Sequence, residues 1–128
     1  STNLQFILDA LKKTNGKRLV IDSLTAFLTA CPEKFEYRIL MHLLYKMLKT
    51  QDITTIMTCS VPMGTDTLGI GVEEFVADSI IILENVIDGL ELKTKFIVRK
   101  MRGTNHSRKY HNVIITDKGL QILPFVIT

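Results

Sequence analysis

The sequence predicts an α/β fold, with a mostly parallel sheet flanked by helices and a C-terminal antiparallel β extension. Two observations support this prediction. Up to about residue 85, short apolar runs rich in β-branched residues alternate with segments of helical periodicity, as in parallel sheets covered by helices. From about residue 86 to residue 128, polar and apolar residues alternate between glycine-containing turns, as in half-exposed antiparallel strands.

Composition limits the classes of protein to consider. The 128 residues, 46% hydrophobic and 23% charged, suit one globular domain or part of one rather than a disordered chain. No apolar run is long enough to cross a bilayer, and the first residues lack a signal-peptide pattern. Cys31 and Cys59 form no CxxC pair or Cys/His cluster, so we expect buried thiols in a reducing compartment and a cytoplasmic protein.

Positive charge is concentrated in one segment, although the net charge is only +3. No carboxylate occurs between Glu91 and Asp117. This basic interval contains Lys93, Lys95, Arg99, Lys100, Arg102, His106, Arg108, Lys109 and His111. Its local field would suit the phosphates of a nucleotide or a nucleic acid, and the alternative is a solvated basic hairpin.

The first helix and strand follow one another closely. Apolar residues at helical spacing predict a helix from Leu4 to Leu11, capped by Ser1 or Thr2 and ended at Thr14-Asn15-Gly16. The stretch Lys17 to Ser23 then predicts a strand buried on both faces. Asp22 comes at its C-terminal end, where open α/β sheets bind their ligands.

The next segments predict a helix between two parallel strands. Leu24 to Ala30 could be a short helix or a loop, and Glu33 to Lys49 is the strongest helix. Its apolar face consists of Leu40, Leu43, Leu44, Met47 and Leu48. We expect His42 to be an exposed helix residue rather than a ligand. Ile53 to Cys59 predicts a second strand, parallel to the first.

The second half begins with a loop that is a candidate for function. Val61 to Gly71 is rich in Gly, Thr and Pro and follows the C-terminal end of a parallel strand. After it we predict a helical turn over Val72 to Ala77 and an apolar strand over Ile80 to Leu83. The predicted β extension then has a hairpin turn at Asp88-Gly89, strands Glu91–Val98, Val113–Thr116 and Leu120–Val126, and a turn at Asp117-Lys118-Gly119.

Four stretches resemble a known family: VIDSLTAF, TTIMTCS, GVEEFVADSIIIL and RKMRGTNHSRKYHNVIITDKGLQILP. In this order and spacing, from about Lys17 to Pro124, the chain resembles the KaiC-like branch of the RecA-type ATPases. The resemblance implies a RecA-like fold with a C-terminal β extension. It also implies that ATP and Mg²⁺ bind between neighbouring subunits of a ring, commonly a hexamer.

The resemblance assigns roles to individual residues. Asp22 matches the Walker B aspartate, which holds Mg²⁺ through water. Lys100 and Arg102 match a basic pair that reaches the γ-phosphate of the neighbouring subunit, where cations can stabilise the charge of a transferring phosphoryl group. Three further positions match residues that line the nucleotide: Thr104, His106 and, near the base or sugar, Asp117.

The sequence departs from the family pattern at two places. It contains no GxxxxGK[ST], the phosphate-binding loop that in the family lies upstream of the first helix together with the catalytic glutamates. Glu73 and Glu74 match a helix turn instead. At Cys59-Ser60, relatives often carry an acidic or strongly polar residue next to the γ-phosphate. Ser60 can orient a water or sense the phosphate, but it cannot repel or deprotonate a water. We therefore expect ATPase activity of an intact parent protein. For these 128 residues alone we expect weak or absent binding of ATP and Mg²⁺, without hydrolysis.

Two other functions remain open at this point. A non-catalytic assembly or regulatory module would retain the ring-forming surfaces and self-associate without nucleotide. Nucleic-acid binding is less favoured, because the loop Val61 to Gly71 has no Lys, Arg or aromatic residue to track phosphates or stack on bases.

Overall fold

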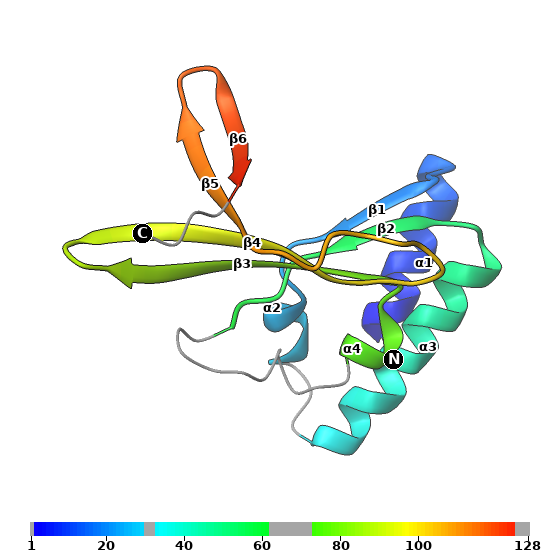
Figure 1. The fold of residues 1–128 in the computed structure, drawn as a ribbon. Helices are drawn as coiled ribbons and strands as arrows, with labels where there is room; N and C mark the ends of the chain where they lie inside the picture. Colours follow the sequence, from blue (N-terminus) through cyan, green and yellow to red (C-terminus); the bar gives the residue numbers. More distant parts are fainter. Residues whose placement is uncertain (1, 30–32, 62–72, 125–128) are drawn as a thin grey trace. The chain divides into compact units, whose positions relative to one another are not determined.

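A computed structural model describes residues 2–29, 33–61 and 73–124 of the chain (Figure 1). The chain forms two compact units, Ser1–Val76 and Ala77–Thr128. Of the predicted loop Val61 to Gly71, only Val61 is among the described residues, and Cys31 also lies outside them. None of the described helices is long and apolar enough to span a bilayer.

The first unit contains four helices and two parallel strands among its described residues. The elements are α1 (Thr2–Thr14), β1 (Arg18–Ile21), α2 (Leu24–Leu28), α3 (Lys34–Thr50), β2 (Thr54–Met57) and α4 (Glu73–Val76). β1 and β2 pair in parallel, with Arg18 opposite Thr54 and Ile21 opposite Met57. Because α2 and α3 connect these strands, the predicted strand–helix–strand arrangement is confirmed.

Local sequence signals set the ends of the helices. Asn15 has a φ of 50°, and the Gly16 N–H donates to the Leu11 carbonyl at 3.0 Å, which ends α1 where the sequence predicts. At the start of α2, the Ser23 hydroxyl accepts a hydrogen bond from the Ala26 N–H and so serves as N-cap. The segment after β1 is therefore a short helix rather than a loop.

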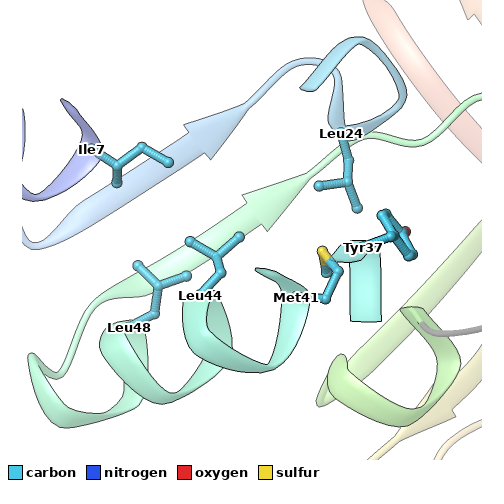
Figure 2. Packing of buried hydrophobic residues seen from close by; sticks show 6 residues of the cluster. All are labelled: Ile7, Leu24, Tyr37, Met41, Leu44 and Leu48. Carbon is cyan, nitrogen blue, oxygen red and sulfur yellow. The ribbon is translucent and has the colours of Figure 1, made fainter. Parts of the chain in front are cut away.

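The core of the first unit lies between α3, α1 and one face of the strand pair (Figure 2). Its buried residues are Ile7, Leu24, Tyr37, Met41, Leu44 and Leu48, with Leu19, Ile21 and Met57 among the partly buried residues packed against them. Spacings of three and four residues along α3 place Tyr37, Met41, Leu44 and Leu48 on one stripe. The prediction for Leu43 was wrong: its side chain is 48% exposed, because the stripe is centred on Met41 and Leu44. His42 is exposed, as predicted.

The prediction that β1 is buried on both faces was also wrong. Val20 and its β2 partner Ile56 are 65% and 63% exposed. Successive strand residues point to opposite faces, and the packed residues Leu19 and Ile21 face the core. In the described part of the unit, α1 and α3 contribute to one core on that single face, so the other face stays open.

The second unit is a four-stranded antiparallel sheet among its described residues. Its strands are β3 (Ser79–Asp88), β4 (Glu91–Met101), β5 (His111–Thr116) and β6 (Gly119–Pro124), in the spatial order β3-β4-β5-β6 (Figure 1). Gly89 and Gly119 have φ values of 62° and 107° at the two predicted hairpin turns. The predicted strand Ile80 to Leu83 is part of the longer β3, which pairs antiparallel with β4.

Candidate functional site

Two of the predicted site residues lie at the same edge of the strand pair in the first unit. Asp22 directly follows β1, and Ser60 follows β2 by three residues. Because β1 and β2 are parallel, their carboxyl ends meet at one edge, where α/β sheets place ligand-binding groups. Asp22 and Ser60 are both exposed there. The peptide bond between Asp22 and Ser23 is cis.

Hydrogen bonds tie the ends of β1 and β2 together. The Thr58 hydroxyl donates to Asp22 Oδ1 at 2.6 Å. The Thr58 N–H donates to the Ile21 carbonyl at 3.0 Å, and the Thr58 carbonyl accepts from the Leu24 N–H at 2.7 Å. These contacts fix the backbone on both sides of Asp22 relative to Thr58.

Thr25 holds the backbone of Ser60. Its hydroxyl accepts from the Ser60 N–H at 2.9 Å and donates to Cys59 Sγ at 3.6 Å. Cys59 is exposed, so the expected burial of its thiol was wrong. The thiol lies beyond the end of β2, past the residues that pack against the core, and this position explains its exposure.

An open groove of about 530 Å³ lies between α1 and β1 and includes Asp22 and Ser23 in its lining. Apolar residues of both elements form most of its wall, among them Phe6, Leu11 and Val20. Its volume is in the range of small-molecule sites, which span roughly 300–1,000 Å³. Asp22 is thus an exposed residue that also lines a recess of the surface.

The donor atoms at this edge suit one kind of metal. Among the described residues, no group of three or more His, Cys, Asp or Glu side chains could hold a metal ion. What the edge offers is one exposed carboxylate, Asp22, with hydroxyl side chains at Thr25 and Ser60. Mg²⁺ usually keeps several waters and takes one or two carboxylates plus the phosphates of a substrate. The chemistry of the residues thus fits a water-bridged Mg²⁺ and not a dedicated metal cage.

The two predicted trans-acting cations lie at the end of β4 in the second unit. Lys100 Nζ donates to the Ala77 carbonyl at 2.8 Å. Arg102 Nη1 forms an ion pair with Asp78 Oδ1 at 2.9 Å, and the Arg102 N–H donates to the Asp78 carbonyl at 2.8 Å. The two-residue segment before β3 therefore orients both cations. Each side chain of the Arg102–Asp78 pair remains 47% exposed and accessible.

The other predicted site residues lie at two separate places in this unit. Thr104 and His106 are in the segment that follows Arg102, where the Thr104 N–H donates to the Met101 carbonyl at 3.2 Å. Asp117 is exposed in the turn between β5 and β6. Because Phe96 pairs with His111 and Thr94 with Val113, the residues beyond Phe96 run away from this turn. The structure thus groups Thr104 and His106 with the cations by chain proximity, and it does not bring Asp117 to them.

The basic interval contains no carboxylate in the sequence, but in the structure carboxylates lie next to several of its cations. Carboxylates of β3 and the residue before it face several of its cations. Lys93 pairs with Asp88 and Arg102 with Asp78, and Lys95 lies opposite Glu84 in the strand register. The ion pair between Asp88 and Lys93 changes the pKa of both groups. Hydrogen bonding and charge from Lys93 lower the pKa of Asp88, and the same interaction raises the pKa of Lys93. Such pairing weakens the field that a nucleic-acid backbone would require.

Sequence reasoning did not identify three residues that contact the predicted site groups: Thr58, Thr25 and Asp78. One signal for Thr58 and Thr25 was available, since each lies within four residues of a strand end at the predicted ligand edge. For Asp78 the only signal was a carboxylate just before a strand that pairs with the basic β4. These partners depend on strand register, which the sequence does not specify at single-residue precision.

The fold is that of an α/β protein in which a carboxylate, Asp22, stands at the carboxyl end of a parallel strand. Residues 2–126 match the family described as "ATPase: KaiC". The chain therefore belongs to the KaiC-like ATPase family, which confirms the predicted resemblance. The family is described as one of ATPases.

Similar proteins of known sequence or structure agree with this assignment. The circadian clock oscillator protein KaiC of Parathermosynechococcus lividus is 34% identical over 119 residues, which cover 90% of this chain and 21% of that protein. A UPF0273 protein of Pyrococcus furiosus is 37% identical over 122 residues, which cover 94% of this chain and 48% of that protein. The crystal structure of a KaiC-like protein from Pyrococcus horikoshii OT3 matches with a TM-score of 0.82 and 34% identity, over 96% of this chain and 56% of that chain.

This chain thus spans about half or less of the length of these relatives. The structural match supports the predicted RecA-like α/β fold with its antiparallel β extension.

Proposed function

We propose that this chain is the C-terminal part of a KaiC-like ATP-binding domain that contributes to a nucleotide site between subunits. The observation that carries the proposal is the position of Asp22 at the carboxyl end of a parallel strand in a chain of this family. In an intact parent protein of this kind, the site would support ATP hydrolysis in a ring, for which a hexamer is the expected form.

In this proposal Asp22 acts within its own subunit as the Walker B aspartate. One of its carboxylate oxygens accepts a hydrogen bond from Thr58, and its exposure leaves it accessible to metal-bound water. When bound, Mg²⁺ supplies positive charge to the phosphates of the nucleotide. Ser60 extends the same edge, where its hydroxyl can orient a water or sense the γ-phosphate.

Lys100 and Arg102 act on the nucleotide of a neighbouring subunit. Dispersed negative charge on a transferring phosphoryl group is stabilised by cations held in place beforehand. The contacts with Ala77 and Asp78 hold these two cations in a defined arrangement. Thr104 and His106 follow in the same segment and are proposed to line the nucleotide, and Asp117 is proposed to approach its base or sugar.

The proposal predicts different behaviour for metal binding and for turnover by the 128-residue chain. The sequence contains no GxxxxGK[ST] motif, whose backbone N–H groups and Lys hold the phosphates of a nucleotide. We therefore expect no measurable ATP hydrolysis by the purified chain. We expect metal binding by this chain alone to be weak, because it does not hold the phosphates that complete the shell of a Mg²⁺ ion. At high concentration, added Mn²⁺, an oxygen-seeking probe for Mg²⁺ sites, should broaden the NMR signals of residues near Asp22.

Asp22→Asn separates the proposal from nonspecific binding, because an amide keeps the size of the carboxylate but loses its charge. In the variant, Mn²⁺ should no longer broaden the signals of Ser23 and Ser60 more than those of Asp52, which precedes β2 at the opposite end of the strands. Unchanged broadening would contradict the Mg²⁺ role of Asp22. ATP turnover that depends on Asp22 would contradict the division of the site between subunits.

A second candidate function is a non-catalytic assembly module, and exposed apolar side chains in the second unit favour it. They include Ile87, Leu90, Leu92, Ile115 and Leu120. Exposed apolar side chains mark an interaction site where they form one contiguous patch. This function predicts concentration-dependent self-association in sedimentation velocity that does not change with ATP. A monomer at all concentrations, with and without ATP, would argue against it.

A further inference from the structure

Thr58 is the residue that contacts the Asp22 carboxylate directly. Its hydroxyl donates to Asp22 Oδ1 at 2.6 Å, a distance typical of a strong hydrogen bond to a charged acceptor. Among the residues that the structure describes, no other side chain is seen to donate to Asp22. Within the described part of the first unit, Thr58 is therefore the side chain that orients the carboxylate.

The backbone around Thr58 has little freedom to move. Its N–H donates to the Ile21 carbonyl, and its carbonyl accepts from the Leu24 N–H. Ile21 and Leu24 flank Asp22 and Ser23, so the Thr58 backbone is bonded to the chain on both sides of the aspartate. A hydroxyl carried by such a backbone can hold the carboxylate in one orientation, because the donor itself has a fixed position.

The bond directs the Oδ1 oxygen of the carboxylate to Thr58, and Asp22 as a whole is an exposed residue. A water-bridged Mg²⁺ needs an acceptor oxygen at a defined position, since the ion keeps a nearly octahedral shell of waters. Groups that orient a metal-associated side chain in this way generally contribute to metal affinity without touching the metal.

We propose that Thr58 is a positioning residue that fixes the Asp22 carboxylate for water-mediated contact with Mg²⁺. This inference rests on the proposed function, in which Asp22 supports the ion. The same hydrogen bond could instead serve only to join β1 to β2. A measurement of metal binding and a measurement of stability separate these two roles.

The experiment is a Mn²⁺ titration of the 128-residue chain followed by NMR, with Asp52 as the internal reference for nonspecific binding. Four variants are compared with the wild type. Thr58→Val keeps the shape and removes the hydroxyl, whereas Thr58→Ser keeps the hydroxyl. Asp22→Asn removes the acceptor charge. Thr55→Val is the matched control, because Thr55 lies in β2, three residues before Thr58, but its hydroxyl donates to the Ile53 carbonyl.

We expect Thr58→Val to need about tenfold more Mn²⁺ for the same broadening at Ser23 and Ser60, at the low end of the roughly 10–100-fold losses seen for such orienting groups. Thr58→Ser and Thr55→Val should stay close to the wild type. If Asp22→Asn removes the broadening and Thr58→Val does not, the inference is wrong while the proposed function stands. If Asp22→Asn leaves the broadening unchanged, the proposed function itself fails.

A measurement on the wild type keeps the inference testable even if Thr58→Val does not fold. Three-bond couplings of the Asp22 side chain should show a single rotamer, in contrast to rotamer averaging at the exposed Asp52. Averaged couplings at Asp22 would overturn the inference. Equal losses of thermal stability in Thr58→Val and Thr55→Val, with Mn²⁺ broadening unchanged in both, would show that the hydroxyl has no role in metal binding.

Discussion

The two units are stabilised in different ways. In the first, helices and strands enclose a cluster of buried side chains centred on α3 (Figure 2). In the second, Val113 is the one buried apolar residue among those described, and many side chains of the antiparallel strands are exposed. A sheet with so small a core relies on ladder hydrogen bonds and cross-strand pairs, and it gains from a partner surface. The first unit places its carboxylate, Asp22, between hydrogen-bonded strand ends, whereas the second carries its cations on a sheet with little buried core.

The largest effect should come from a change in the core of the first unit. Leu44 is 1% exposed, so Leu44→Ala removes buried methyl groups and leaves a cavity. We expect a loss of about 2–5 kcal/mol in the free energy of unfolding. Urea unfolding followed by circular dichroism at 222 nm measures it. This signal reports mainly on the first unit, because the described residues of the second contain no helix.

Leu43→Ala is the matched control, since Leu43 is the neighbouring leucine but points away from the core stripe. Its loss should be below about 1 kcal/mol, as for surface substitutions. Equal losses in the two variants would contradict the position of the core and, with it, the contrast between the units.

Leu43 also shows how far the sequence determines the fold. The order of the elements, the parallel pairing of β1 with β2 and the two hairpin turns could be predicted, because periodicity and turn residues act locally. The sequence could not predict where the buried stripe of α3 is centred, or that the strand face with Val20 and Ile56 is exposed. Both depend on which surfaces other elements cover, and that is a property of the tertiary structure.

The candidate site, like the fold, could be predicted from the sequence only in part. The sequence predicts Asp22 and Ser60 at the ligand edge, and the structure brings these two strand ends together. Thr58 and Asp78 were missed because each acts through a side-chain partner more than twenty positions away in the chain. Only the register of the strands reveals such pairs. The intersubunit roles of Lys100 and Arg102 stay a prediction based on the family.

A smaller effect should follow from a change in the second unit. Val113→Ala removes two buried methyl groups, and Val113 is 8% exposed. We expect a loss of about 1.5 kcal/mol, at roughly 0.8 kcal/mol for each buried methylene-sized group. Amide hydrogen exchange of β5 and β6 should become faster, while exchange in α3 should change little.

Ile115→Thr serves as the control for Val113→Ala, because Ile115 is on the same strand but exposed, and Thr retains β-branching. Its exchange rates should match those of the wild type. If Val113→Ala leaves the exchange of β5 and β6 unchanged, the second unit lacks even this small core, and the contrast with the first unit becomes sharper.

The smallest effect concerns the ion pair Asp88–Lys93 next to the β3–β4 turn. The hydrogen bond and the positive charge of Lys93 lower the pKa of Asp88 below its usual 3.8, and Lys95 adds a weaker effect of the same sign. An Asp with a lowered pKa stabilises the folded state above its ordinary pKa, and this stabilisation is lost as the pH falls through the lowered value. The pKa of Lys93 is raised above 10.5, so its contribution is present below that pH and lost as the pH rises through the raised value.

Lys93→Met should therefore raise the pKa of Asp88 toward 3.8, and Lys95→Met should raise it less, because the Lys95 contribution is purely Coulombic and ranks behind both effects of Lys93. An NMR titration of the Asp88 side-chain carboxyl between about pH 2 and 6 measures both shifts, in the range where Asp side chains titrate. Because the pair is exposed, solvent screens it, and the unfolding midpoint at neutral pH should barely move. Equal shifts in the two variants would show that long-range charge sets the pKa of Asp88. In that case the cations of the second unit act as a diffuse field rather than as individually positioned groups, unlike the fixed contact between Thr58 and Asp22 in the first.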